Sequence, residues 1–119
     1  MIDCRRQIAD ALLTVCDNVK GSRPEGRVVL PLITYAEVTN VNTSRYEDRI
    51  EYQVDVYTNN FEQLIQTVKS VSETLEGMGW HRTYVTPDSQ ARVETGLYKK
   101  SLNFTARVDT RINNITGGY

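Results

Sequence analysis

The sequence predicts a single α+β domain in which two helices cover one face of a mainly antiparallel four-stranded sheet, in the order α-β-β-α-β-β. Three observations lead to this prediction. Between residues 46 and 78 the hydrophobic period changes from two to that of a helix, so a long strand runs directly into an amphipathic helix. Further segments with alternating apolar residues occur at 31–40 and 97–110. The chain has 119 residues, enough for one hydrophobic core but not for two.

The first element is expected to be an amphipathic helix from Asp3 to Lys20, ended by Gly21. Its apolar stripe consists of Ile8, Leu12, Val15 and Val19. The two cysteines of the chain, Cys4 and Cys16, lie on or near this stripe. A helix would separate them by roughly 18 Å, which is beyond the reach of a disulfide. Both are therefore expected to be small, buried, unpaired side chains.

Two strands are expected next, after a loop at residues 22–30. The first strand, at residues 31–40, should turn one alternate set toward the core: Leu32, Thr34, Ala36 and Val38. Residues 40–45 are polar and read as a turn. In the second strand the apolar set Ile50, Tyr52, Val54 and Val56 alternates with Glu51, Gln53 and Asp55. This alternation is typical of a half-buried strand.

The second helix is predicted to begin after Asn60, which is a suitable N-cap, with Gln63 as its capping-box partner. Gly77 and Gly79 should end it. Its apolar stripe repeats at helical spacing: Phe61, Leu64, Ile65, Val68, Val71, Leu75 and Met78.

A third strand at residues 80–86, a loop at 87–96 and a fourth strand at 97–110 complete the expected domain, which spans residues 1–110. The fourth strand should turn Leu102, Phe104, Ala106 and Val108 inward. Residues 111–119 have little reason to be ordered alone and are expected to form a flexible C-terminal tail.

The sheet face that the helices leave uncovered is expected to be polar but rich in tyrosine. It should carry Tyr35, Glu37, Glu51, Gln53, Asp55, Tyr57, Asn103, Thr105 and Arg107. Such a surface is either solvated or used for contact with another protein. The long strands favour contact, because exposed strand edges need protection or a partner.

Catalytic and metal-binding residues are not expected. His81 is the single histidine of the chain, and no cluster of cysteines or carboxylates shares its part of the sequence. No serine lies in a nucleophile elbow, and no glycine-rich loop is suited to phosphate. We therefore expect no enzyme activity, no cofactor, no metal, and no catalytic role for His81 or either cysteine.

The paired acids of the second strand have a structural explanation. Glu47 and Asp48 lie next to Arg45 and Arg49 in the sequence. Glu51 and Asp55 belong to the polar face of the second strand. We expect these charges to form a solvated strand face with cross-strand ion pairs.

Membrane and nucleic-acid partners are not expected either. No apolar run approaches the roughly 20 residues that span a bilayer, and charges interrupt the N-terminal segment where a signal peptide would be apolar, so synthesis in the cytoplasm is expected. The net charge of −1 lacks the basic excess of proteins that bind phosphate backbones. The nearest RNA-binding pattern surrounds Tyr98, Lys99, Lys100 and Phe104, but its two aromatics are six residues apart, and Phe104 belongs to the core-facing set.

The order of the elements and their local sequences resemble those of one family, the tail-terminator proteins of long-tailed bacteriophages, also called tail-completion or tail-to-head joining proteins. The resemblance covers nearly the whole chain. It is carried by the Arg/Pro/Gly loop before 30–35 (LPLITY), by 46–57 (YEDRIEYQVDVY) and the helix after it, by Gly79-Trp80, and by 95–100 (TGLYKK).

This resemblance implies a structural virion protein that forms a hexameric ring on the head-proximal end of the tail tube. Such a ring stops polymerisation of the tube and provides the surface on which the filled head docks. The implied partners are further copies of the chain, the major tail tube protein, and the head-tail connector or head-completion protein. The implied location is the tail or neck of the virion, assembled in the host cytoplasm. The family supplies no catalytic residues.

The three loops, at residues 22–30, 40–45 and 87–96, are long for so small a domain, and with the C-terminal tail they are the expected docking surfaces. The sheet edges are expected to close the ring. Three alternatives stay open at this point. They are another neck component such as a head-completion protein, a small monomeric RNA-binding module, and an enzyme without a recognisable motif.

Overall fold

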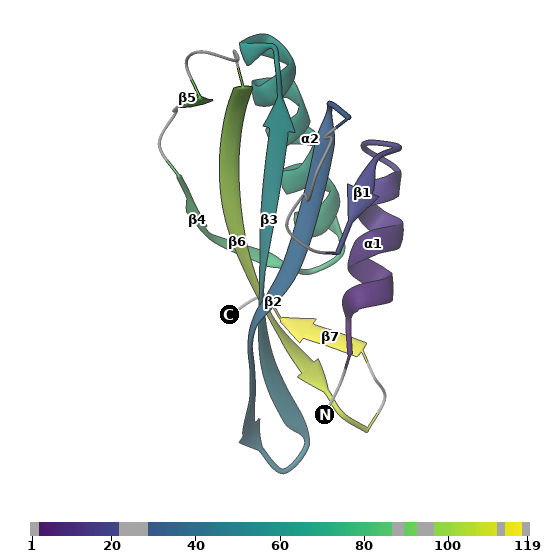
Figure 1. Cartoon of the computed structure of the whole chain (residues 1–119). Coiled ribbons are helices and arrows are strands. Elements are labelled where there is room, and N and C mark those ends of the chain that lie inside the picture. The colour runs from purple at the N-terminus through teal and green to yellow at the C-terminus, as the bar shows by residue number, and fades with distance from the viewer. Residues whose placement is uncertain (1–2, 22–28, 87–89, 93–96, 112–113, 118–119) are drawn as a thin grey trace.

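A twisted sheet runs the length of the molecule, and both helices lie on one side of it (Figure 1). The structure, a computed structural model, describes residues 3–21, 29–86, 90–92, 97–111 and 114–117. The elements are α1 (Arg5–Leu13), β1 (Val19–Lys20), β2 (Leu32–Ser44), β3 (Glu47–Thr58), α2 (Phe61–Gly77), β4 (His81–Val85), β5 (Gln90–Arg92), β6 (Leu97–Asp109) and β7 (Asn114–Gly117). The main path of the sheet is β1-β2-β3-β6-β4, and β5 and β7 each pair with β6. The α+β class and the two helices on one face are thus confirmed.

The sheet differs from the expected four antiparallel strands, because it is mixed and has additional short strands. β1 pairs in parallel with β2 through Val19 with Ile33 and Lys20 with Thr34. The remaining pairings, β2 with β3 and β6 with β3, β4, β5 and β7, are antiparallel. Consequently the expected order α-β-β-α-β-β describes the long elements only.

The first helix is shorter than the expected range from Asp3 to Lys20. It ends at Leu13, and the hydroxyl of Thr14 donates a hydrogen bond of 2.6 Å to the carbonyl of Ala11. The following residues include β-branched side chains and Asp17-Asn18, which favour a helix less than the preceding residues do. Pairing with β2 then draws Val19 and Lys20 into the sheet. Cys16 therefore lies beyond the helix, and the helical distance between the two cysteines does not apply.

The second helix begins after Asn60, and the predicted N-cap at this residue is confirmed. The side-chain oxygen of Asn60 accepts a hydrogen bond of 3.1 Å from the backbone N–H of Gln63. The helix extends to Gly77, and Gly79 adopts a φ of +99°. A Cβ built on Gly79 would lie 3.0 Å from Cγ2 of Ile115 in β7, so this position needs glycine for both its backbone and its neighbour.

The face of β2 that meets the core is the opposite of the expected one. Ile33 pairs with Val56 and Tyr35 with Val54, so these β2 residues share the helix-covered face. Ala36 and Val38 are exposed instead. The alternation was ambiguous because Leu32, Ile33 and Thr34 are all buried, which removes the period of two at the start of the strand.

The core confirms the inward set of the long strands. The buried strand residues include Ile50, Tyr52, Val54 and Val56 from β3 and Leu102, Phe104, Ala106 and Val108 from β6. The helices contribute Ile8, Ala11, Leu12, Leu64, Val68, Val71 and Leu75. Trp80, just before β4, is 2% exposed and closes this core.

Two segments that were expected to be irregular form short strands that pair with β6. Gln90–Arg92, from the expected loop at residues 87–96, forms β5, while 87–89 and 93–96 lie outside the described residues. Asn114–Gly117, from the expected C-terminal tail, forms β7 opposite the end of β6. Part of that segment is therefore paired in the sheet.

Candidate assembly surfaces

The distal part of the β2–β3 hairpin, residues 38–49, projects beyond the helices and is called the hairpin arm below (Figure 1). It contributes to the elongation of the molecule, whose principal extents are 50 × 25 × 22 Å. The loop expected at residues 40–45 is instead strand as far as Ser44. The Asn42 side chain explains this difference, because its amide donates to the Glu47 carbonyl at 3.3 Å and to Oδ1 of Asp48 at 3.0 Å. These cross-strand bonds satisfy polar side chains that otherwise favour turns.

The exposed charges of the hairpin arm are all positive. Arg45 and Arg49 are exposed, whereas Glu47 is half-buried and Asp48 is 3% exposed. Asp48 accepts its hydrogen bond from Asn42. The expected ion pairs between these arginines and neighbouring acids do not form among the described residues.

An arginine–tyrosine stack supports the tip of the arm. The guanidinium of Arg45 lies 5.3 Å from the centroid of the Tyr46 ring, and that of Arg111 lies 4.5 Å from it. Arg111 also holds Asp109 through two hydrogen bonds, from Nε at 3.1 Å and from Nη2 at 2.8 Å, which lower the pKa of that carboxyl. The end of β6 thereby fixes the aromatic ring of the hairpin turn.

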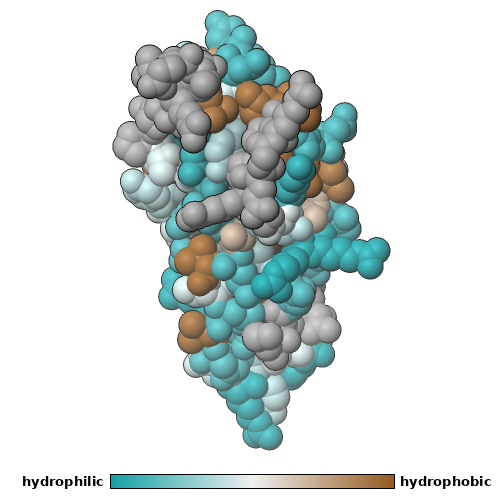
Figure 2. Space-filling model, in the orientation of Figure 1, coloured by the Kyte–Doolittle hydropathy of each residue, from teal (hydrophilic) through white to brown (hydrophobic). Residues whose placement is uncertain are grey.

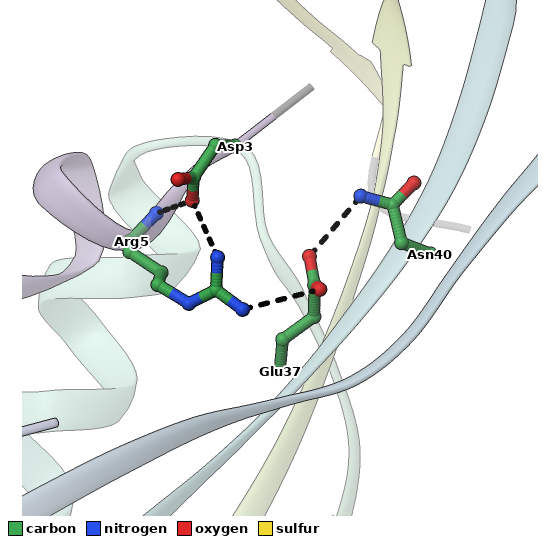
Figure 3. Close-up of polar contacts among 4 residues, drawn as sticks. All are labelled: Asp3, Arg5, Glu37 and Asn40. Carbon is green, nitrogen blue, oxygen red and sulfur yellow. Dashed lines mark hydrogen bonds and ion pairs between the residues drawn. The ribbon is translucent and has the colours of Figure 1, made fainter. Parts of the chain in front are cut away.

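The root of the arm is fastened to α1 by a small polar cluster (Figure 3). Arg5 contacts Asp3 at 3.3 Å and Glu37 at 3.6 Å, and the Asn40 amide donates to Glu37 at 3.1 Å. The ladder between β2 and β3 shifts register between Glu37 and Thr39, so the cluster lies where the arm leaves the body. Exposed pairs of this kind contribute little free energy, and their effect is to orient the arm.

The uncovered face of the sheet is predominantly hydrophilic, with isolated hydrophobic groups (Figure 2). Its side chains are held by amides: Asn103 donates to Glu51 at 3.0 Å and Gln53 donates to Asp55 at 3.0 Å. The register places the expected members on this face except for two, since Tyr35 and Glu37 lie on the helix-covered face.

On the helix side, the outward surface of α2 combines apolar and acidic residues. Phe61 and Ile65 are 42% and 38% exposed, and Glu62, Glu73 and Glu76 are exposed as well. A groove of about 550 Å³ separates this helix from β4 and β6, with Ile65, Lys69 and Arg82 among its lining residues. A second hollow of about 440 Å³ lies between the end of α1 and α2, where Leu13 and Val29 are exposed.

The fold does not place the described residues that could act in catalysis or metal binding near one another. His81 is exposed at the start of β4, opposite Thr105. Within the described ranges no group of three or more histidine, cysteine, aspartate or glutamate side chains is placed to hold a metal ion. No described helix has the length and apolar character needed to cross a membrane.

The two cysteines differ in environment, and both are unpaired. Cys4 is buried, and burial, followed by the nearby charges of Asp3 and Glu37, raises the pKa of its thiol to about 11. A thiol with that pKa is protonated at neutral pH and is a poor nucleophile. The half-buried Cys16 donates weakly to the carbonyls of Asn18 and Pro31.

The residues of the RNA-binding pattern are divided between the two faces. Tyr98 lies opposite Thr58 and packs against Phe61 of α2, with ring centroids 5.7 Å apart. Phe104 is fully buried, as its alternation predicted. Lys99 lies on the other face, with Nζ 5.5 Å from the centre of the Tyr57 ring. Tyr98 and Phe104 therefore do not form a platform on the open face of the sheet.

Sequence reasoning identified the polar sheet face but missed the hairpin arm and the outward surface of α2. The Asn/Thr-rich residues 40–45 looked like a turn, and only their cross-strand bonds show otherwise. Most of the expected docking loop at residues 22–30 lies outside the described residues.

No protein-family model and no curated protein sequence matches the chain. Among solved structures, the chain is similar to one from a particle described as the virion of a native gene transfer agent. The TM-score is 0.58 at 16% sequence identity, and the match covers 87% of this chain and 90% of that chain. The similarity extends over nearly the full length of both chains and shows a common fold.

Proposed function

We propose that this chain is a structural virion protein that caps the head-proximal end of a phage tail tube as a hexameric ring. In this role it stops polymerisation of the tube and presents the surface on which the head docks. The observation that carries the proposal is the fold shared with a virion chain over 87% of the length. The local resemblance of the sequence to tail-terminator proteins points in the same direction.

The shape of the chain suits such an assembly. A projecting arm at one end and the exposed residues of α2 on the body are different surfaces (Figure 1), and different surfaces produce head-to-tail contacts. Head-to-tail contacts that close by rotation give a ring. The partners in this proposal are further copies of the chain, the major tail tube protein, and the connector or head-completion protein, and the site of action is the neck of the virion.

We also propose that the role involves no catalysis. The exposed His81 lies apart from the buried Cys4 thiol, and both belong to separate parts of the fold. A His81→Ala chain that folds normally should support assembly as well as the parent chain does. Loss of a measurable catalytic activity in that variant would contradict this part of the proposal.

The decisive experiment combines native mass with binding to tail tubes. Light scattering over a concentration series should show hexamers, either from the chain alone or once tubes are present, and negative-stain microscopy should show the added ring at one tube end. A protein that remains monomeric and does not bind tail tubes is not a tail terminator. Binding to a purified connector without binding to tubes would instead favour a head-completion role.

A further inference from the structure

The sheet has an open edge on each of its two sides. Its main path runs β1-β2-β3-β6-β4, and β1 pairs only with Ile33 and Thr34 of β2. Among the described strands, none pairs with the outer side of β2 over residues 35–44, and none pairs with the outer side of β4 (Figure 1). Strand edges of this kind bind a further strand unless they are blocked.

The outer edge of β2 lacks the residues that usually block such pairing. Residues 39–44 (TNVNTS) contain no charged residue and no proline, and three of the six are β-branched. Bulges also limit pairing at an edge, and the ladder from β2 to β3 shifts register on each side of residues 39–42. In β4 the shift lies between Arg82 and Tyr84, so the end of that strand is regular. Each edge therefore offers a short regular segment to a partner strand.

An exposed apolar residue lies on the uncovered face at each of these edges. Val41 is 54% exposed and lies opposite Arg49 of β3. Tyr84 is 56% exposed and lies opposite Asn103 of β6. An aromatic residue directly opposite a β-branched one stabilises a pair of strands. Pairing of the two edges can thus cover both side chains.

The backbone of Val41 is directed into its own sheet. The carbonyl of Tyr46 accepts a hydrogen bond of 2.8 Å from the N–H of Thr110, which follows β6. Because the two directions alternate along an antiparallel strand, Arg49 turns its backbone groups to the other side, toward Val41. Val41 therefore directs its own backbone groups toward β3.

The backbone of Tyr84 is directed inward in the same way. The N–H of Thr86 donates a hydrogen bond of 2.9 Å to the carbonyl of Ser101 in β6. Tyr84 precedes Thr86 by two residues in a regular part of the strand, so it also faces β6. Two residues that both face inward meet across a new ladder as a non-hydrogen-bonded pair, in which the side chains are closest.

The charges of the two strands do not oppose this pairing. Glu37 is the only charged residue of β2, and it lies outside residues 39–42. β4 contains His81 and Arg82 but no acid. No two like charges of β2 and β4 are therefore placed opposite each other.

Building on the proposed ring, we propose that the outer edge of β2 in one copy pairs with the outer edge of β4 in the next copy, with Val41 opposite Tyr84. The three ladders between β2 and β4 are all antiparallel, so these two strands run in opposite directions. Copies in the same orientation then pair antiparallel, with residues 39–42 facing residues 83–86. Because the two edges differ, the contact is head to tail, and the sheets of neighbouring copies become continuous.

This register suits a closed ring. Within one copy, Tyr84 lies in the row of Asn103 and Gln53, whereas Val41 lies in the row of Arg49. Neighbouring copies are therefore offset by the length of β3 from Arg49 to Gln53, about 13 Å, over a sheet width of about 19 Å per copy. That offset tilts the strands by about 35° from the ring axis, at the lower end of the range found in closed sheets.

Disulfide trapping tests the register. Val41→Cys and Tyr84→Cys chains, each also carrying Cys16→Ala, are mixed under conditions in which the ring assembles, with tail tubes where these are needed, and are mildly oxidised. Non-reducing electrophoresis should show covalent dimers in the mixture only, because a non-hydrogen-bonded pair places its Cα atoms about 4.5 Å apart, within reach of a disulfide. A chain carrying both new cysteines should give a ladder of covalent multimers.

A matched control replaces Tyr84→Cys with Val29→Cys, a position that is 66% exposed at the other side of the fold's α1–α2 hollow, and should give no dimer. Rings that form without the disulfide between Val41→Cys and Tyr84→Cys overturn the proposed register. Dimers of Val41→Cys alone or of Tyr84→Cys alone would mean that like edges pair, and they overturn the head-to-tail contact.

Charge substitution provides an independent test. Val41→Glu/Tyr84→Glu places like charges opposite each other, whereas Val41→Glu/Tyr84→Lys places opposite charges there, and the new Glu faces Arg49 within its own chain. Association should weaken about tenfold per contact in the first variant and recover in the second. Thermal unfolding identifies variants that fail to fold, and for these the trapping experiment decides.

The outcomes separate this contact from the proposed function. Equal association of the two folded charge variants overturns the edge pairing and leaves the proposed function standing, provided that the parent chain forms rings. A parent chain that associates with neither itself nor tail tubes overturns the proposed function, and the edge pairing with it.

Discussion

Trp80 packs edge-on against Tyr52, with ring centroids 5.7 Å apart and ring planes at 87°. Tyr52 comes from the middle of β3, and Trp80 lies between the end of α2 and β4, so the contact joins the sheet to the return from the helix. Both side chains are buried. Burial raises the pKa of the Tyr52 hydroxyl, and the negative charge of nearby Glu37 adds to the effect. Neither that hydroxyl nor Nε1 of Trp80 has a hydrogen-bond partner among the described residues.

Tyr52→Phe should therefore be neutral or raise the free energy of unfolding by up to about 1 kcal/mol, because it removes a buried polar group without breaking a hydrogen bond. Trp80→Ala should lower the same free energy by about 3–5 kcal/mol through the cavity it creates. Urea denaturation monitored by circular dichroism measures both. A cost above about 1 kcal/mol for Tyr52→Phe would mean that the hydroxyl has a partner.

The cap of α2 gives a second prediction. Asn60→Ala removes the side-chain acceptor of the Gln63 N–H and should cost about 1 kcal/mol of unfolding free energy. Asn60→Asp keeps an acceptor and should restore most of that loss. The neighbouring Asn59→Ala is the matched control, since Asn59 is exposed and does not cap the helix. Equal effects at both positions would contradict the assignment of the cap.

Alkaline pH should destabilise the fold through Cys4. The pKa of this thiol is about 11 in the folded chain against 9.0 for an ordinary thiol, so the folded state holds the proton more tightly than the unfolded state does. The stabilisation that the protonated Cys4 thiol contributes is thus fully present below pH 9 and is lost as the pH rises toward about 11. The raised pKa of Tyr52 acts in the same direction.

The Cys4 contribution has a slope of at most about 1.4 kcal/mol per pH unit. Cys4→Ala should flatten the decline, although it lowers stability at neutral pH by on the order of 1 kcal/mol. Cys16→Ala leaves Cys4 in place and should keep the decline of the parent chain. Denaturation midpoints measured between neutral pH and pH 11 test this, and an unchanged slope in Cys4→Ala would contradict it.

The sequence could predict those elements whose two faces differ in polarity. In β3 and α2 the buried apolar residues repeat on one face, so the strand, the helix and its N-cap followed directly from the residues, although Phe61 and Ile65 of the predicted apolar stripe are exposed. At the start of β2 three consecutive residues are buried, and the period no longer identifies the inner face. The end of α1 was also misplaced, since the pairing of Val19 with Ile33 is a non-local interaction.

The candidate surfaces were less predictable because they depend on contacts between distant residues. The charge of the arm follows from the burial of Asp48, which depends on its pairing with Asn42 and with Val108 of β6. The acids and bases of residues 45–49 balance in the sequence, and only the fold exposes the arginines. Tyr98 and Lys99 are neighbours in a strand, so their division between opposite faces follows from the sequence, whereas the packing of Tyr98 on Phe61 required the fold.

The last prediction concerns nucleic acid. The net charge is −1, Tyr98 packs on Phe61, and Phe104 is buried, so we expect no useful affinity for duplex or single-stranded oligonucleotides at physiological salt. A ring through which DNA moves should avoid strong cationic attraction to phosphate, because such contacts would oppose the movement.

Fluorescence anisotropy with short labelled oligonucleotides, repeated at several salt concentrations, tests this prediction. Binding that weakens steeply with salt and disappears in Lys99→Glu/Lys100→Glu would favour an RNA-binding module over a tail terminator. Binding that disappears in Arg45→Glu/Arg49→Glu would make the hairpin arm a phosphate contact. If the parent chain gives no signal at low salt, where phosphate contacts are strongest, the exposed arginines are available for a protein partner.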